Sequence, residues 1–492
     1  MGTTDNNQRK KPTKAQLERR RRRRRRALML RAVSLAIVLI VLAGGIWAVT
    51  AGIRRSSEKK AAEKAAREAK IKAEENALQS RKNALEEAER MAMGYDYDGA
   101  IELLRSIEGY EEDADIIAAI AGYTATKSTL VSIDVTTVPH IFYHSLINDT
   151  DRAFDVNTLG QSTVDGMNAW MTTIEEFDAI TQQMYDNGYV FVSIKDLVVE
   201  TENEDGTITL SKNTNLKLPA GKKPMVLSLD DLSYYHSYEP AGFPNKLVID
   251  SDGIVRCEYT DAQGNTTVGD YDVVARLESF IREHPDASYK GARGIIALTG
   301  YNGVFGYRTD TAYKTGVDLT PDQQEWLDKH PDFNWDKEVE EATKVANALK
   351  EEGWEFASHT WGHLSVTDKS VDTLKTDHEK WKATVENIIG PTDIIIFAHG
   401  ADIGSWQGYS DDNPQYAYFK SQGFNYFCNV DGSQKAWLQI TSDYLRQGRI
   451  NLDGYMLYKA SQGNTDVTEA LFDAGSVFDS RRPTPVVAVG KG

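Results

Sequence analysis

The longest purely apolar stretch of the chain is an uncharged run at residues 32–53. A helix over this run rises about 1.5 Å per residue and spans roughly 33 Å, which matches the hydrocarbon core of a bilayer. The run is longer than the apolar core of a usual signal peptide, and it contains only loose small-residue cleavage sites. We therefore predict a retained transmembrane helix rather than a cleaved signal peptide.

Two helical patterns follow the apolar run. Residues 54–83 are rich in Ala, Glu, Lys and Arg, which favour a helix but bury too little surface for a stable coiled coil. We predict a solvated helical stalk there. Residues 84–127 resemble a single tetratricopeptide-like helical hairpin. Because such units need neighbours to be stable, we expect a spacer docked on the next domain.

From residue 137 the pattern becomes an alternation of strands and helices. The order of β then α continues to about residue 460 and predicts a parallel barrel or an open parallel sheet, in which chemistry lies at the carboxyl ends of the strands. An inserted β-hairpin is expected near 246–270, and 461–492 forms a C-terminal segment. Apolar runs predict strands at 138–144, 189–194, 224–229, 354–357, 394–397 and 423–427, and amphipathic periodicity predicts helices at 172–187, 337–352 and 371–389.

Charge divides the chain into two unlike parts. Residues 1–55 contain 15 basic and 2 acidic residues, whereas the remainder contains 41 basic and 71 acidic residues, so the net charge of −17 combines +13 with −30. A nucleic-acid-binding role is disfavoured because most of the chain would repel phosphates.

The arginine run Arg19–Arg26 stands just before the apolar run. By the positive-inside rule it predicts a single-pass protein of the plasma membrane, with residues 1–31 as a basic cytoplasmic tail and the large domain extracellular. The same arginines would attract anionic lipid head groups.

Cys257 and Cys428 are the only cysteines. Their separation excludes a cysteine-based zinc finger or a closely spaced redox pair. We expect two unrelated structural thiols rather than a disulfide.

Candidate chemistry follows two of the predicted strands. Asp230 and Asp231 come directly after a buried strand, where turn and cap aspartates are also common. His359 and His363 follow another strand, and their four-residue spacing brings both imidazoles together on a helix face or in a suitable turn. One aspartate and two histidines suit zinc, with cobalt, nickel, iron or manganese as alternatives, and leave positions open for water and substrate.

The order of these motifs resembles the first two motifs of the polysaccharide deacetylases, carbohydrate esterase family 4. Tyr143-His144 is similar to the opening strand of that domain, and the resemblance covers residues 137–460. It implies a distorted (β/α)7 barrel that removes acetyl groups from N-acetylated or O-acetylated glycans. It also implies a metal held by Asp231, His359 and His363, and Asp230 as the general base.

Two family features are missing from the sequence. The third motif, usually Arg-x-Pro-Tyr-Gly, is replaced by Ile396–Gly400 and lacks the arginine that orients the base. A substitute must come from elsewhere, with Arg308, Arg446 and Arg449 as candidates, or be absent. No histidine follows His399, so the usual general acid of the fifth motif is gone, and the candidate acid is His399, His144 or a metal-bound water.

Aromatic residues near the strand ends are candidates for stacking on a sugar ring. We single out Tyr234 and Trp361 as substrate-binding residues, with Trp406 and Trp437 as further members of the same groove.

The leading hypothesis is a bacterial, extracytoplasmic, metal-dependent deacetylase that acts on a cell-wall glycan, either peptidoglycan or an exopolysaccharide. The alternative is a catalytically weak or inactive glycan-binding scaffold that retains the barrel and the metal site.

Overall fold

The computed structural model describes residues 13–405 and 407–490. The chain divides into two compact units, Met1–Asn83 and Ala84–Gly492. Residues 1–12 of the predicted basic tail, and Trp406, lie outside the described residues.

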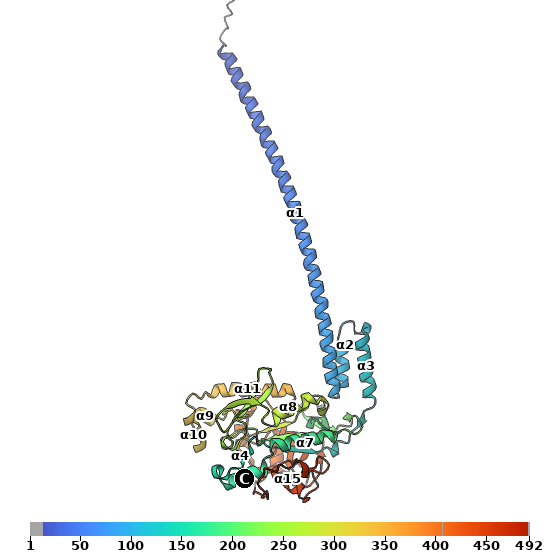
Figure 1. Cartoon of the computed structure of the whole chain (residues 1–492), viewed down its shortest axis with the longest axis vertical. Coiled ribbons are helices and arrows are strands. Elements are labelled where there is room, and N and C mark those ends of the chain that lie inside the picture. Colours follow the sequence, from blue (N-terminus) through green and yellow to red (C-terminus); the bar gives the residue numbers. More distant parts are fainter. Residues whose placement is uncertain (1–12, 406, 491–492) are drawn as a thin grey trace, which may run out of the picture. The chain divides into compact units, whose positions relative to one another are not determined.

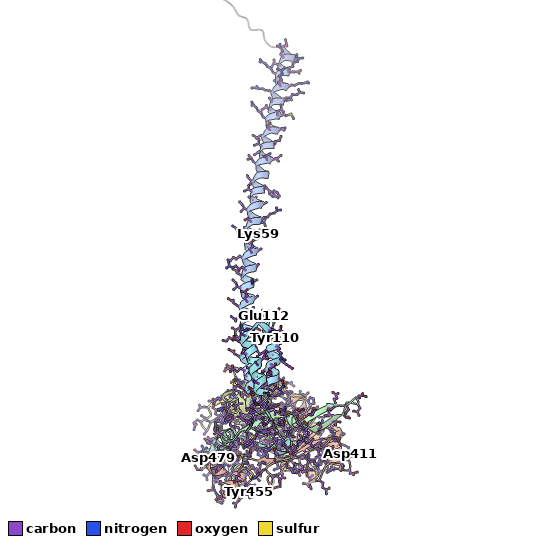
Figure 2. The ribbon with its side chains drawn as sticks, turned by 90° about the vertical axis from the view of Figure 1, so that its right-hand side faces the viewer. Lys59, Tyr110, Glu112, Asp411, Tyr455 and Asp479 are labelled. Carbon is purple, nitrogen blue, oxygen red and sulfur yellow. The ribbon has the colours of Figure 1, made fainter. Side chains whose placement is uncertain are left out.

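A single helix, α1 (Lys14–Met93), carries the described part of the basic tail, the apolar run and the stalk without a break. In the first unit its side chains project on all sides, Lys59 among them (Figure 2). Exposed i,i+4 pairs such as Arg54–Glu58 and Lys59–Glu63 support the polar portion. The apolar portion is long enough to cross a membrane and has no buried residues, which makes α1 a candidate membrane span.

In the second unit the last turns of α1 pack with α2 (Tyr97–Arg105) and α3 (Ala114–Lys127). Asp96 and Asp113 accept backbone N–H groups at the starts of α2 and α3. The cluster formed by these helices also includes Val190 and Leu218 of the following domain. The helical hairpin therefore shares a core with that domain.

Seven parallel strands form a closed barrel around the core of the second unit. The strands follow one another in chain order, and the last pairs with the first, so the sequence pattern resolves to a barrel and not to an open sheet. This confirms the expected (β/α)7 architecture. The strands are β2 (His140–Tyr143), β7 (Lys223–Asp230), β11 (Ile295–Leu298), β12 (Glu355–Ser358), β13 (Ile394–Ile396), β14 (Tyr426–Val430) and β16 (Leu445–Asn451).

Helices cover the outside of the barrel, and α7, α8 and α11 are seen around the strands in Figure 1. Helix α7 begins at a capping box in which Thr173 and Glu176 satisfy each other's backbone N–H groups, as its sequence signature indicates. The longer helices are α6 (Gln161–Trp170), α7 (Ile174–Asp186), α8 (Val273–Glu283), α10 (Pro321–Lys329), α11 (Trp335–Glu352), α12 (Val371–Trp381), α14 (Pro414–Ser421) and α15 (Gly454–Ser461).

Further strands lie outside the seven-stranded barrel, and all but β3 pair antiparallel. The insertion near residue 246 has three strands, because β10 pairs with β9 beside the expected β8–β9 hairpin. Strand β15 pairs antiparallel with β16, and the short β3 pairs with the first residues of β7. These strands are β3 (Tyr189–Phe191), β4 (Val198–Glu202), β5 (Ile208–Lys212), β8 (Lys246–Ile249), β9 (Val255–Thr260), β10 (Thr266–Gly269) and β15 (Trp437–Ile440).

Both cysteines are buried free thiols in separate clusters of the core. The expectation of two unrelated structural thiols is confirmed.

Candidate active site

The two adjacent aspartates stand at the carboxyl end of β7. Asp230 is the last residue of the strand, and Asp231 turns the chain in a left-handed conformation with φ of 58°. Arg449, on β16, donates two hydrogen bonds to the Asp230 carboxylate, at 2.6 and 2.9 Å. This fork geometry is the strongest arrangement available to a guanidinium and a carboxylate.

Arg449 is therefore the partner of Asp230, and the other two candidate arginines bond elsewhere. Arg308 donates to the carbonyl of Tyr234, and Arg446 pairs with Asp402. Burial acts to raise the pKa of Asp230, but Arg449 and His359 outweigh it and hold that pKa well below its usual value. Asp230 is ionised throughout the neutral range.

Asp231, His359 and His363 converge beside Asp230. Their ligand atoms all lie within 4.8 Å of one another. His359 Nδ1 lies 2.8 Å from the carbonyl oxygen of Ile396; since a carbonyl only accepts, Nδ1 carries the proton and Nε2 is free to bind a cation. Burial lowers the pKa of His359, which favours the neutral, ligating imidazole.

Tyr235 completes the fit to a metal ion. Its hydroxyl donates to Asp231 Oδ1 at 2.8 Å, which leaves Oδ2 facing His363 Nε2 at 3.4 Å. A hydrogen bond to the carboxylate oxygen that faces away from the cation site orients the carboxylate as a ligand. The donor set thus suits a divalent cation with open positions for water and substrate.

A turn, rather than a helix, brings the two histidines together. Thr360 and His363 have φ of 62° and 52°, so the segment is not helical. Asp377 of α12 fixes this turn by accepting the backbone N–H groups of Trp361 at 2.6 Å and Gly362 at 2.9 Å. Of the two geometries that the spacing allows, the structure has the turn.

These groups open into a cleft of about 590 Å³. That volume lies within the range of small-molecule sites. The cleft lining includes the paired aspartates and five histidines, His144, His236, His359, His363 and His399. Further polar and aromatic side chains in the lining are Phe142, Trp170, Tyr235, Tyr238, Tyr301, Asn302, Asp322, Asn451 and Asp453.

The family model of the polysaccharide deacetylases matches residues 332–402. This range contains His359, His363 and the strand end with His399. Over this range the chain is similar to the polysaccharide deacetylases. The match supports a hydrolase that acts on carbohydrate acetyl groups.

Among solved structures, the Streptococcus pyogenes deacetylase PplD in complex with acetate is similar to this chain at 15% identity and a TM-score of 0.33. The likeness covers 66% of this chain and 94% of that chain. A comparison with curated proteins gives no match.

The two histidines that the sequence offers as candidates for the general acid, His144 and His399, both line the cleft. The Nε2 atom of His399 lies 3.1 Å from the carbonyl oxygen of His363, so that nitrogen donates its proton to the backbone. His144 directly follows β2, and it interacts electrostatically with Asp230, Asp231 and Asp453, although burial raises the pKa of Asp453. His144 is thus close to all three carboxylates.

The two aromatic residues singled out for substrate binding, Tyr234 and Trp361, lie outside the cleft lining. Tyr234 is 1% exposed and donates to Asp272 at 2.7 Å, within the core. The Trp361 indole packs over Gly300, where an added Cβ would lie 2.3 Å from its Cδ1 atom, and Lys380 lies over its other side at 4.3 Å from the ring centroid. Trp437 stacks on Arg446.

Tyr235 and Tyr301 occupy the cleft instead, with ring centroids 5.1 Å apart. The sequence analysis chose Tyr234, whereas its neighbour Tyr235 lines the cleft; the backbone at Tyr234 is left-handed, with φ of 47°. Arg449 and Asp453 also had no motif to mark them.

Proposed function

We propose that this chain is an extracytoplasmic, metal-dependent deacetylase of N-acetylated or O-acetylated cell-wall glycan, either peptidoglycan or an exopolysaccharide. The observation that carries the proposal is the ionised Asp230–Arg449 pair beside a ligand set of one aspartate and two histidines. A base next to a cation site is the arrangement required to hydrolyse an acetamide.

The cation site is made of Asp231, His359 and His363, and its mixed ligands favour zinc, with cobalt, nickel, iron or manganese as alternatives. A divalent cation bound there would supply Lewis-acid polarisation of the acetyl carbonyl. Tyr235, the Ile396 carbonyl and Asp377 hold these ligands in place.

Asp230 takes a proton from the attacking water as the water oxygen bonds to the acetyl carbon. The hydrogen bonds from Arg449 hold the Asp230 carboxylate in one orientation for this proton transfer. His144 then gives a proton to the amide nitrogen as the C–N bond breaks, and acetate and a free amine leave. His399 is the second candidate for this proton, but its Nε2–H is engaged with the His363 carbonyl.

The cellular location is part of the proposal. The apolar run of α1 and the arginines Arg19–Arg26 support a single-pass anchor with a cytoplasmic N-terminus, held by anionic lipids. The catalytic domain then lies outside the plasma membrane, where a cell-wall glycan is found.

The experiment uses the full chain in detergent, loaded with zinc, and measures acetate release from acetylated chito-oligosaccharides and from peptidoglycan. We expect turnover that falls about 100-fold or more in Asp230→Asn, since a positioned base contributes roughly 10²–10⁴ to the rate. Metal content, measured by elemental analysis, should be unchanged. The exposed Asp372→Asn on α12 is the control.

A specific observation favours a second candidate, a glycan-binding scaffold: the usual histidine acid is missing. Absence of turnover on the whole panel, together with glycan binding, would establish that scaffold and overturn the enzyme.

A further inference from the structure

Behind Asp230, a chain of polar side chains crosses the inside of the barrel. Arg449 donates to Ser228 Oγ at 3.1 Å in addition to Asp230. Ser228 Oγ lies 2.9 Å from His140 Nε2, and His140 Nδ1 lies 3.1 Å from Gln447 Oε1. These residues come from β7, β2 and β16, three adjacent strands, and Arg449, Ser228, His140 and Gln447 are all 0% exposed.

The direction of every hydrogen bond in this chain follows from the guanidinium. Arg449 only donates, so Ser228 accepts from it and its single hydroxyl proton is left for His140. His140 Nε2 therefore accepts, and Nδ1 carries the proton that is donated to Gln447 Oε1. Gln447 Nε2 then donates to the Val138 carbonyl at 3.0 Å, where the chain ends.

Charge supports the same arrangement. Burial and the neighbouring Arg449 hold the pKa of His140 well below its usual value, so the imidazole is neutral and has one proton to place. A protonated His140 would direct two donors at its neighbours and leave the Ser228 proton without an acceptor. One tautomer alone satisfies the hydrogen bonds among Ser228, His140 and Gln447.

We propose that Ser228 and His140 are positioning residues that act through Arg449 on the catalytic base. The inference rests on the proposed function, because it assigns a role in that reaction. Neither residue lines the cleft. Their effect is to fix the plane of the Arg449 guanidinium and so to fix the Asp230 oxygens. A face of the guanidinium also lies over Phe142, with 4.1 Å between Cζ and the ring centroid.

Two variants of His140 separate positioning from packing. His140→Gln keeps an acceptor for Ser228 and a donor for Gln447, whereas His140→Leu removes both. In the zinc-loaded full chain we expect kcat to fall roughly 10–100-fold in His140→Leu, the range usual for a lost supporting hydrogen bond. KM should change less than twofold, and His140→Gln should recover most of the loss.

Ser228→Ala is a smaller second variant in case His140→Leu does not fold, and it should lower kcat in the same range. Thr392→Val is the matched control, because it removes a hydrogen bond to the Phe356 carbonyl before β13, away from the cleft lining. It should lower the thermal midpoint without lowering kcat. Equal kcat in Ser228→Ala, His140→Leu and the wild type would overturn the inference.

A spectroscopic measurement tests the network without turnover. With ¹⁵N-labelled histidine, His140 should show a protonated Nδ1 and an unprotonated Nε2 that do not titrate between pH 5.5 and 8. The reverse tautomer would refute the network. An inactive wild type with the expected His140 signals would overturn the proposed function and not the network, so the two failures are distinguishable.

Discussion

At the scale of single residues, the Asp230–Arg449 pair couples stability to pH. The folded-state pKa of Asp230 is depressed below its unfolded value of about 4. Its contribution to stability is therefore fully present above pH 4 and is lost as the pH falls through the lower folded-state pKa.

Replacing Arg449 with methionine leaves the Asp230 charge buried without its partner. We expect a loss of about 3–5 kcal/mol at pH 7, the usual cost of breaking a buried pair. The loss should shrink towards pH 4, because the uncompensated carboxylate then takes up a proton. Urea unfolding at the two pH values measures both. A pH-independent difference would contradict the assigned pairing.

Tyr235 is a second residue whose effect is measurable alone. Tyr235→Phe removes the hydroxyl that orients Asp231, and we expect the zinc dissociation constant to rise roughly 10-fold. Competition with a chromogenic chelator gives the constant. The control is Tyr238→Phe, which alters a neighbouring ring of the cleft. Equal affinities in both variants would refute the role of the Tyr235 hydroxyl.

The metal-ligand cluster was predictable at this scale because each ligand follows an apolar strand that is visible in the sequence. Asp231, His359 and His363 meet as expected. Tyr234 could not be placed, since its inward direction depends on a backbone turn and on Asp272, 38 positions away.

At the scale of elements, α12 supports the histidine turn from outside the cleft. Asp377→Ala removes the acceptor of two backbone N–H groups in that turn. We expect weaker zinc binding, by roughly 10-fold, although no ligand is changed. Isothermal titration measures it, with the exposed Asp372→Ala on the same helix as control. Unchanged zinc affinity would show that the histidine turn keeps its conformation without Asp377.

Strand β16 explains why the sequence left the partner of Asp230 open among Arg308, Arg446 and Arg449. Its residues Arg446, Gln447 and Arg449 are buried, yet they give it the composition of a surface segment. Hydrophobic periodicity finds strands such as β7 and β13, whose buried residues are apolar, and it misses a strand whose interior face is polar. The hydrophobic pattern therefore did not predict β16, the strand that carries Arg449.

At the scale of the whole molecule, the apolar run of α1 is expected to anchor the protein. Leu39→Arg with Val41→Arg places two charges in the middle of the run, at about 2.5–3.5 kcal/mol each on insertion scales. We expect the protein to move from the membrane to the soluble fraction. Ile71→Arg, in the stalk, is the control and should stay in the membrane fraction. Retention of the double variant would argue against a membrane span.

The closure of the barrel has a consequence for the order of events during synthesis. Asp230 and Arg449 lie 219 positions apart, and β16, the last barrel strand made, is also the one that pairs with β2, the first. Contacts of such long range form late, after loop closure. During synthesis Asp231, His359 and His363 are therefore made before Arg449, and we expect Asp230 to gain its two hydrogen bonds from Arg449 only when the final strand joins the barrel.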